Sequence, residues 1–478
     1  MKRIAIVGGG CAGLSAAFTL EKLRKSGAAA EYTLFESSGR FGGVLATETV
    51  DGCQIEAGPD SFLTEKPWAS DFCRELGIGE QLIASNDIDR KTYIVVKGRL
   101  IAIPDGLMFM VPTKILPTVF SPLFSLGTKA RMAREWFHPP RKAQADETVA
   151  SLVERHYGPE MVDRLADPLL SGVYGGGASE LSARAALPRF AEMEAKYGSL
   201  GRGMIAARRK MVKSRNAPAR PLFTALTGGM QAIADTAVSQ LKAAALRVNS
   251  PVRSVQPQNS GWVISAGYAS DHFDAVVIAT PAHIAADLVE IASPALAAEL
   301  RAVQYTSSIT VNLGYAGDVR QMLPPGFGFL IPRSEGTRMM ATTFVHTKFP
   351  HRAPPARALL RCFIGGSRNE ALLDADDDEI LNIVRSELAQ IIGLRAEPLF
   401  TRVYRWRRAM AQYPVGHLER LGRIEALLQQ LPGLALAGNG YRGIGVPDCI
   451  RTGTEAAQKC LAVLGLAAVV PHRMPATM

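Results

Sequence analysis

The chain has 478 residues, of which 47% are hydrophobic and 21% are charged. These fractions are typical of a folded globular protein and exclude a disordered chain, a collagen-like repeat and a disulfide scaffold. Lysine and arginine total 54 against 44 aspartate and glutamate residues, and the net charge of +10 favours anionic partners without identifying one.

The cysteines and the apolar runs indicate the compartment. The six cysteines form no CxxC pair, which is typical of reduced thiols in the cytoplasm. No apolar run reaches the roughly 18 residues that are needed to span a bilayer. The glycines at 8–10 interrupt the N-terminal apolar run too early for a signal peptide. We therefore expect a cytoplasmic protein that is soluble or peripheral on the cytoplasmic face of the membrane.

The N-terminal residues predict the opening of a doubly wound nucleotide-binding fold. Residues 4–7 form a short apolar strand, residues 11–25 carry apolar side chains at helical spacing, and residues 32–35 form a second strand. A G-x-G-x-x-G pattern at 8–13 allows a tight turn and close approach of a pyrophosphate to the helix N-terminus. Glu36 ends the second strand, where a carboxylate accepts hydrogen bonds from ribose hydroxyls and disfavours a 2′-phosphate.

Two stretches of unusual composition follow a hairpin that is predicted at 91–104. Residues 106–130 hold three prolines and no acidic residue, so they predict short helical turns with exposed apolar sides. Residues 196–220 hold eight basic residues and no acidic one. This second stretch is either a solvated face and a linker or, together with 106–130, a surface that rests on an anionic membrane.

The pattern returns to alternating strands and helices after residue 222. A glycine turn at 227–230 precedes a helix that runs to Leu241. Further strands are predicted at 246–248, 262–264, 275–279, 309–313, 339–344, 359–364 and 434–437. A last helix is predicted from about Asp448. The nucleotide-binding fold is therefore divided along the chain, with other domains inserted between its parts.

Two glycine-rich turns narrow the choice of cofactor. Residues 36–43 read E-x-x-x-R-x-G-G, a pattern more typical of FAD enzymes than of nicotinamide dehydrogenases. Residues 438–448 end a strand and begin a helix whose N–H groups would face flavin N1 and the C2 carbonyl. The alternative for this second turn is a glycine-rich loop capped by Asp448.

Other chemistries lack their motifs. The sequence has no HExxH, no His/Cys cluster with metal-ligand spacing, no G-x-S-x-G and no P-loop, so no metal site is expected. The basic stretch 196–220 contains one tyrosine and no recognisable nucleic-acid module, so no nucleic-acid partner is expected.

Several longer motifs resemble one family. They are EAGPDSF at 56–62, GVY at 172–174, ELS at 180–182, GFGFL at 326–330, IGG at 364–366 and GIGVPDCI at 443–450. Over nearly its whole length the chain resembles the oxygen-dependent, FAD-containing porphyrinogen oxidases of haem biosynthesis, within the flavin amine oxidase superfamily. These enzymes act on protoporphyrinogen or coproporphyrinogen.

The resemblance implies an α/β fold with three parts. A discontinuous Rossmann-like FAD-binding domain would comprise residues 1–88, 223–295 and 425–478. A β-sheet substrate-binding domain would comprise 89–104 and 296–424. An inserted, mainly helical domain at 105–222 would carry the surface that contacts a membrane.

The resemblance also assigns the ligands of a non-covalently bound FAD. The ADP half would meet Gly8, Gly9, Gly10, Cys11, Ala12, Gly13, Glu36, Ser37, Arg40, Gly43 and Val44. Val252 would meet the adenine through its backbone. The isoalloxazine would lie against Gly58, Pro59, Asp60, Ser61, Ile444, Gly445 and Val446, with Trp406 in the cofactor shell.

The substrate site implied by the resemblance has one cation and three apolar walls. Arg90 would pair with a propionate, because a guanidinium matches a carboxylate by two-pronged hydrogen bonding. The alternative is a surface salt bridge from Arg90 to Asp87 or Asp89. Phe327, Leu330 and Phe363 would hold the macrocycle, although each alone has the character of an ordinary core residue.

The implied reaction is the six-electron oxidation of protoporphyrinogen IX to protoporphyrin IX, with coproporphyrinogen III as the alternative substrate. Flavin N5 would accept a hydride in each of three rounds, and dioxygen would be reduced to hydrogen peroxide. No catalytic residue is assigned, because the flavin carries the chemistry. A homodimer and an anionic membrane surface are open as partners. The rival interpretations are a flavoenzyme that acts on amines or carotenoids and a non-catalytic binding protein on the same scaffold.

Overall fold

The computed structural model of the chain describes residues 1–141, 145–213 and 221–466. Its first sheet has five parallel strands in the order β12-β2-β1-β16-β22. Their bounds are β12 (Leu246–Arg247), β2 (Ala30–Phe35), β1 (Lys2–Val7), β16 (Ala275–Ile278) and β22 (Leu434–Leu436). The apolar residues 4–7 of β1 are buried on both faces, as expected for a parallel sheet covered by helices. The Rossmann-like sheet predicted from the sequence is confirmed.

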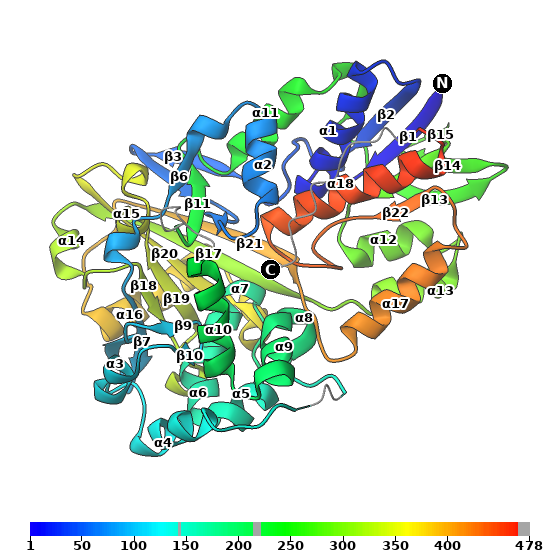
Figure 1. Cartoon of the computed structure of the whole chain (residues 1–478). Coiled ribbons are helices and arrows are strands. Elements are labelled where there is room, and N and C mark those ends of the chain that lie inside the picture. The colour runs from blue at the N-terminus through cyan, green and yellow to red at the C-terminus, as the bar shows by residue number, and fades with distance from the viewer. Residues whose placement is uncertain (142–144, 214–220, 467–478) are drawn as a thin grey trace.

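Helices cover both faces of this sheet (Figure 1). One face packs against α1 (Cys11–Lys25), α2 (Trp68–Glu75), α11 (Gln231–Gln240) and α18 (Val446–Val463). The other packs against α12 (Ala282–Val289), α13 (Pro294–Arg301), α17 (His417–Leu428) and the antiparallel strands β13 (Val252–Gln258), β14 (Gly261–Ala266) and β15 (Ala269–Phe273). The first and last long helices, α1 and α18, lie side by side although they come from opposite ends of the sequence.

The second sheet has seven strands in the order β21-β17-β20-β19-β18-β7-β8, and only the β18–β7 pair is parallel. Their bounds are β21 (Phe400–Ala411), β17 (Tyr305–Ala316), β20 (Arg357–Gly365), β19 (Met339–Phe344), β18 (Gly328–Leu330), β7 (Thr92–Val96) and β8 (Arg99–Ala102). Apolar residues on one face pack against α16 (Asp377–Ile392). The opposite face carries polar as well as apolar side chains and includes the strand residues expected at the substrate site.

Short strands and turns connect the two sheets. They are β3 (Thr47–Val50), β4 (Cys53–Glu56), β5 (Phe62–Leu63), β6 (Leu82–Ala84) and β11 (Phe223–Leu226), with α14 (Val319–Met322) and α15 (Val345–Lys348) beside the second sheet. Cys53 and Ile55 of β4 pack against Val345 and Leu359, so the N-terminal part of the chain is joined to the second sheet through a small apolar cluster.

A helical layer follows β8 along the chain. After the hairpin of β9 (Leu107–Met108) and β10 (Val111–Pro112) come α3 (Ile115–Phe120), α4 (Leu126–Glu135), α5 (Val149–Tyr157), α6 (Pro159–Met161), α7 (Asp167–Tyr174), α8 (Ala183–Ala186), α9 (Pro188–Tyr197) and α10 (Leu200–Lys213). The core of this layer includes Ile94 from β7 and contacts Leu330 from β18, so the helices pack on the second sheet.

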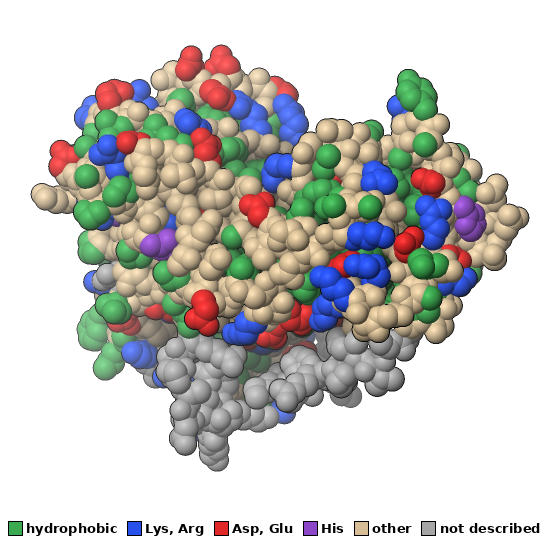
Figure 2. Space-filling model, turned by 90° about the horizontal axis from the view of Figure 1, so that it is seen from above, with side chains coloured by type: hydrophobic (Ala, Val, Ile, Leu, Met, Phe, Trp, Pro, Cys, Tyr) green, Lys and Arg blue, Asp and Glu red, His purple; other side chains and the backbone are tan. Residues whose placement is uncertain are grey.

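The expected short helices with exposed apolar sides are confirmed. Leu116, Phe120, Leu126 and Phe137 are each 69–83% exposed. Figure 2 shows the face at the top of Figure 1, where basic and acidic side chains are mixed with small apolar areas. The helices α3 and α4 lie at the opposite end of the molecule (Figure 1). Of the basic stretch 196–220, residues 200–213 form α10, and 214–220 lie outside the described residues.

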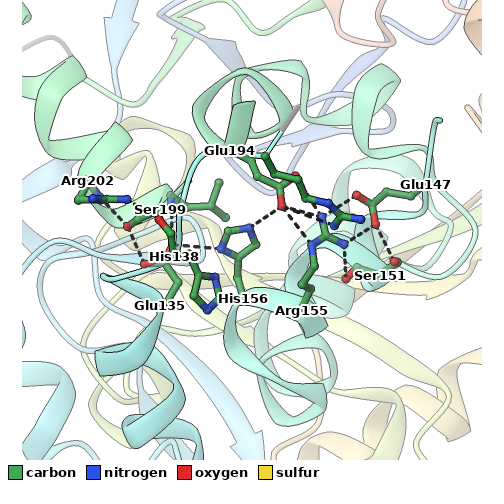
Figure 3. A network of polar contacts seen from close by, with 11 residues as sticks. Glu135, His138, Glu147, Ser151, Arg155, His156, Glu194, Ser199 and Arg202 are labelled. Atoms are coloured by element: carbon green, nitrogen blue, oxygen red, sulfur yellow. Dashed lines mark hydrogen bonds and ion pairs between the residues drawn. The ribbon is translucent and has the colours of Figure 1, made fainter. Parts of the chain in front are cut away.

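A buried histidine joins four helices of this layer. His156 on α5 lies between two carboxylates, with Nδ1 3.1 Å from Glu135 of α4 and Nε2 3.2 Å from Glu194 of α9 (Figure 3). Glu135 also accepts hydrogen bonds from Ser199 and from the Leu200 backbone at the start of α10. Burial opposes protonation of His156, but the two carboxylates raise its pKa above the ordinary value. Both ring nitrogens face carboxylate oxygens, an arrangement that favours the imidazolium because it can donate to both neighbours.

The predicted strands and the last helix agree with the structure, with two differences. The last helix begins at Val446 and not at Asp448, because Gly445 is its N-cap and Pro447 lies in its first turn. The sequence analysis also missed the long strand β21, whose arginines interrupt any apolar alternation.

The proposed domain boundaries remain a prediction. The strands of the five-stranded sheet all fall within 1–88, 223–295 and 425–478. However, the limits at 295 and 425 divide α13 and α17, which pack together against the first sheet. Within the described residues, no helix has the combination of length and apolarity that crossing a bilayer requires.

Candidate functional site: two converging glycine turns

The turn between β1 and α1 is built for close backbone approach. Gly8 has a φ of +104°, and a Cβ at this position would lie 2.8 Å from the carbonyl oxygen of Ala279. A Cβ at Gly13 would lie 1.8 Å from the carbonyl oxygen of Gly8, so only glycine lets α1 pack against the turn. Gly10 caps α1 without a side-chain hydrogen bond, and a Cβ there would meet nothing within 4 Å. The helix N-terminus therefore presents unpaired N–H groups to open space, which suits a pyrophosphate.

Glu36 is fixed beside this turn. It follows β2 directly, and its two carboxylate oxygens accept hydrogen bonds from the backbone N–H groups of Gly9 and Ser38, each at 2.8 Å. The adjoining Ser37 is exposed, with its hydroxyl 3.3 Å from the same carboxylate. Oε2 accepts only the Gly9 N–H and retains a lone pair, so Glu36 can still accept a hydrogen bond from a ribose hydroxyl.

Val252 reaches the same end of the sheet. The Glu36 N–H donates to the carbonyl of Arg247 at 2.7 Å, and the Ser250 N–H donates to the carbonyl of Glu36 at 2.8 Å. Two residues later, Val252 begins β13 and is half-buried. The structure therefore places Val252 next to the expected ribose site, and its contact with adenine remains a prediction.

The loop after Glu36 forms one wall of the open space. The Gly42 N–H donates to the carbonyl of Gly9 at 2.8 Å, and a Cβ at Gly43 would lie 3.2 Å from the Cα of Gly10. Arg40 donates to the carbonyl oxygens of Gly43 at 2.5 Å and Leu45 at 3.0 Å. The guanidinium thus braces its own loop, so the structure gives Arg40 a loop-positioning role and leaves its expected contact with the cofactor as a prediction.

The segment 58–61 continues this wall toward the second sheet. A Cβ at Gly58 would lie 2.0 Å from the carbonyl oxygen of Val44, so the two segments are in direct contact. The indole of Trp406 on β21 donates to the carbonyl of Ala57 at 2.8 Å. Trp406 therefore reaches the backbone just before Gly58, Pro59, Asp60 and Ser61, where the sequence analysis placed the cofactor shell.

The second glycine turn meets the first one. The carbonyl oxygen of Val446 lies 4.0 Å from Sγ of Cys11, and the Ser15 hydroxyl donates to the carbonyl of Ile450 at 3.0 Å. A Cβ at Gly453 would lie 2.0 Å from the carbonyl oxygen of Ala12. The N-termini of α1 and α18 therefore converge, with Ile444 and Gly445 half-buried between them and solvent.

The second turn is held by side chains from other elements. The Tyr413 hydroxyl accepts a hydrogen bond from the Gly443 N–H at 2.8 Å and donates to the carbonyl of Asn439 at 2.7 Å. Asp448 in the first turn of α18 forms a 2.6 Å ion pair with Lys66. These contacts fix the helix start, and neither Tyr413 nor Lys66 was singled out from the sequence.

The comparisons with known proteins agree with this geometry. Residues 11–461 match the family described as flavin containing amine oxidoreductase. The chain belongs to this family. Its glycine turns, the carboxylate of Glu36 beside the first turn and the open space at Gly10 fit a flavin dinucleotide, and the protein is a flavin-dependent oxidoreductase.

Individual relatives cover nearly the whole flavin oxidoreductase chain. It is 35% identical to a Bacillus subtilis protein named coproporphyrinogen III oxidase, over 97% of this chain and 98% of the relative. It is 29% identical to an Arabidopsis thaliana protein named protoporphyrinogen oxidase 2, over 97% and 94% respectively. A crystal structure from Exiguobacterium sp. 255-15 superposes with a TM-score of 0.86 at 29% identity, over 97% of this chain and 99% of that one.

The second sheet brings two of the three predicted substrate walls of this flavin oxidoreductase onto one face. In the strand register, Leu330 pairs with Ala341, and Ala341 pairs with Phe363. Leu330 and Phe363 therefore lie on the same face, opposite the face covered by α16. Phe327 is buried just before β18, between glycines with φ of +137° and +133°, so strand alternation does not fix its direction. Their contacts with a substrate remain a prediction.

The backbone next to Arg90 is hydrogen-bonded to Phe327, and the ion pair that the Arg90 side chain forms is long and weak. It follows a short 3₁₀ helix (Asp87–Asp89), and the neighbouring Lys91 carbonyl accepts the Phe327 N–H at 2.7 Å. The Arg90 side chain is 52% exposed, and its ion pair with Asp87 is long, at 3.9 Å. An exposed pair of this length contributes little stability, so a substrate carboxylate can compete for the guanidinium.

A group of buried charges supports the segment 58–61, and the sequence analysis missed its basic members. Lys348 pairs with Asp60 at 2.9 Å, and Arg352 pairs with Glu56 at 3.1 Å and donates to the carbonyl of Asp60 at 2.8 Å. Arg361 donates to the carbonyl of Gly58. The one signal in the sequence is a charge inside an apolar run, as at Arg361 between Leu360 and Cys362.

These charged groups shift one another's pKa values. Burial alone would raise the pKa of Asp60, but Lys348, Arg361 and Arg352 together hold it well below its usual range. Burial lowers the pKa of Lys348, and Asp60 offsets part of that effect. The segment is therefore fixed by ionised groups in a region of low dielectric, where such contacts are strong.

Proposed function

We propose that this flavin oxidoreductase oxidises coproporphyrinogen III to coproporphyrin III, with FAD as cofactor and dioxygen as electron acceptor. The observation that carries the proposal is the 35% identity, over 97% of the chain, to a relative named coproporphyrinogen III oxidase. Two further relatives with the same name, from Staphylococcus aureus and Propionibacterium freudenreichii, are 30% and 31% identical over at least 97% of the chain. Six electrons leave each substrate, and three molecules of dioxygen become three of hydrogen peroxide.

Protoporphyrinogen IX, the substrate expected first from the sequence, is the second candidate. It is favoured by the 29% identity to the Arabidopsis relative named protoporphyrinogen oxidase 2. The two substrates differ in the number of propionates, four against two. Both carry propionates that can pair with Arg90, so a direct comparison of the two substrates decides between them.

Bound flavin supplies the electron acceptor, and the chain supplies position and environment. Arg90 pairs with one propionate and fixes the rotation of the macrocycle about its own axis. Leu330 and Phe363 offer an apolar face against which the ring system lies, excluding water from the reacting carbon. No side chain is proposed as a general base.

FAD is proposed to be held without a covalent bond. Cys11 and Cys449 are the cysteines at the two turns. Burial raises the pKa of Cys11 well above its ordinary value and that of Cys449 to about 12, so both are thiols at neutral pH. Denaturation in acid should therefore release all of the flavin into the supernatant.

The helical layer at 105–222 is proposed to rest on an anionic membrane. Support comes from the four strongly exposed apolar side chains on and after α3 and α4 and from the basic residues of the stretch 196–220. The division into three domains, the cytoplasmic location and the homodimer also stay proposals.

The test is a steady-state comparison of the purified protein on the two porphyrinogens. The proposal predicts a higher kcat/KM for coproporphyrinogen III and three molecules of peroxide for each porphyrin formed. A higher kcat/KM for protoporphyrinogen IX would select the second candidate. Oxidation of amines but of neither porphyrinogen would overturn both.

A further inference from the structure

A buried arginine lies between the proposed flavin site and the proposed substrate face. Arg361 is in the middle of β20 and is 4% exposed. In the strand register it pairs with Asn312 of β17 and Thr343 of β19, which places it on the face that also carries Phe363. The neighbouring residues Leu360 and Cys362 point to the opposite face and pack in the core under α16.

Arg361 has few partners for a buried charge. Its Nη2 donates to the carbonyl of Gly58, and its guanidinium carbon lies 5.0 Å from the ring centre of Phe363. Its Nε has no hydrogen-bond partner among the described residues. The carboxylates of Asp60 and Glu56 attract the guanidinium without forming a direct ion pair with it. Burying a guanidinium in this way is costly, so its retention calls for a function that needs the charge.

The nearby carboxylates are already committed to other cations. Asp60 is held by Lys348 and Glu56 by Arg352. Three cations therefore face two carboxylates in this buried group, which leaves an excess of one positive charge when all five groups are ionised. The excess lies behind Gly58, whose other side contacts Val44 and, through the adjoining loop, the turn at Gly10.

We propose that Arg361 is a positioning residue for the flavin: it fixes the Gly58 peptide under the ring, and its charge, which no direct ion pair within the described residues neutralises, stabilises the negative charge that the flavin gains on reduction. A substrate carboxylate is the weaker assignment, because Phe363 and the Gly58 carbonyl cover the guanidinium. The inference rests on the proposed function in one respect, that the flavin ring lies over 58–61. Charge of this kind acts strongly where solvent is excluded.

Two properties of Arg361 can be separated by substitution. Arg361→Gln removes the charge, whereas Arg361→Lys keeps it and loses the planar fork that reaches Gly58. Arg402 is the matched control, because it occupies the same rung of the sheet on β21, yet is 39% exposed and paired with Glu48 at 2.8 Å. Arg402→Gln should change the equilibrium constant for flavin reduction and the Kd for FAD by less than about twofold, since exposed ion pairs act weakly.

The experiment measures the two-electron reduction of bound FAD against reference dyes, together with the affinity of each apoprotein for FAD. Arg361→Gln is expected to lower the equilibrium constant for reduction at least tenfold, which corresponds to about 30 mV. Arg361→Lys should keep a near-normal potential and bind FAD more weakly. The inference is overturned if Arg361→Gln holds FAD at the wild-type potential, or if Arg361→Lys lowers the potential as far as Arg361→Gln.

The two proposals fail in different ways. The wild-type protein could be yellow and bleached by porphyrinogen while the Arg361→Gln variant keeps the wild-type flavin potential. That result would overturn only the role of Arg361. Wild-type protein that binds FAD but reacts with no porphyrinogen would sink the proposed function and leave the dye measurement of Arg361 intact. If Arg361→Gln does not fold, the Arg361→Lys variant alone decides, because a positioning role predicts retained potential with weaker FAD binding.

Discussion

The hydroxyl of Ser15 in α1 donates a hydrogen bond to the carbonyl oxygen of Ile450 in α18 at 3.0 Å, although the two residues are 435 positions apart. This contact brings the two glycine turns together, since Ser15 lies one turn into the first helix and Ile450 one turn into the last. The proposed dinucleotide site therefore forms only when α1 and α18 are folded against each other.

The close approach of these helices predicts opposite effects for two glycine substitutions. Gly453→Ala in α18 should destabilise the protein by about 1–3 kcal/mol and weaken FAD binding, because its Cβ would lie 2.0 Å from the Ala12 carbonyl oxygen. Gly422→Ala in α17, where a Cβ meets nothing within 4 Å, should instead stabilise by up to about 1 kcal/mol. Thermal unfolding of both variants, with and without FAD, measures the two changes in stability. Equal shifts in Tm for the two variants would contradict the close contact between α1 and α18.

Arg90 is expected to act in binding more than in turnover. Arg90→Ala should raise the KM for the porphyrinogen about tenfold or more and change kcat by less than about threefold, because a lost charge-assisted hydrogen bond costs roughly 1.5–3 kcal/mol. Arg99→Ala on β8, an exposed strand residue outside the proposed site, is the control. Steady-state kinetics of both variants make the comparison. An unchanged KM in Arg90→Ala would remove this residue from the site.

The imidazolium of His156 predicts a stability that depends on pH. Its pKa in the folded protein is raised by Glu135 and Glu194 against the opposing effect of burial, with His138 and Arg155 as the nearby cationic or titratable groups. The stabilisation is therefore complete below about pH 6.5, the pKa of an unfolded histidine, and is lost as the pH rises through the raised folded value.

His156→Gln tests this dependence. The variant should be less stable than wild type by on the order of 3 kcal/mol at pH 6, and the gap should narrow toward pH 9. His272→Gln, an exposed position on β15, should show no such trend. The measurement is the free energy of unfolding in denaturant at several pH values. A gap that stays constant with pH would show that His156 packs as a neutral ring.

The exposed side chains of α3 predict membrane affinity. Leu116 and Phe120 are 69% and 80% exposed and lie four residues apart, on one side of the helix. Replacing both with serine should reduce sedimentation with anionic vesicles at least severalfold, because the buried apolar area and the lipid charge act together. Leu399→Ser, at an exposed residue just before β21, is the control. Equal sedimentation of all three proteins would argue against contact through α3.

The parts of the fold that could be predicted are those encoded locally. The segment from β1 to Glu36 carries its turn, helix and strand in consecutive residues, so composition and spacing are sufficient. Likewise, the prolines between 106 and 130 predict short helices, because they prevent one long helix. By contrast, β21 could not be predicted, because Arg402, Arg405 and Arg407 interrupt its apolar pattern and most of its residues are only half-buried.

The site could be predicted where a motif identifies it and not where distant charges meet. The convergence of the two glycine turns was expected from the resemblance and is confirmed by the contacts of α1 with α18. Nothing in the sequence indicates that Lys348, Arg352 and Arg361 meet under one backbone segment, because a cation in a sequence is most often a solvated side chain. Arg361 is buried by the long-range pairing of β20 with β17 and β19, whereas Lys348 and Arg352 lie on α15 and in the turn that follows it.

The most direct test of the proposed oxidation is a single anaerobic turnover. Wild-type protein carrying oxidised FAD is mixed with coproporphyrinogen III without oxygen, and the visible flavin absorbance is followed. The proposal predicts that the flavin bleaches on mixing, and that readmitted oxygen restores the colour with release of hydrogen peroxide and porphyrin. Flavin that stays oxidised with both coproporphyrinogen III and protoporphyrinogen IX would contradict it.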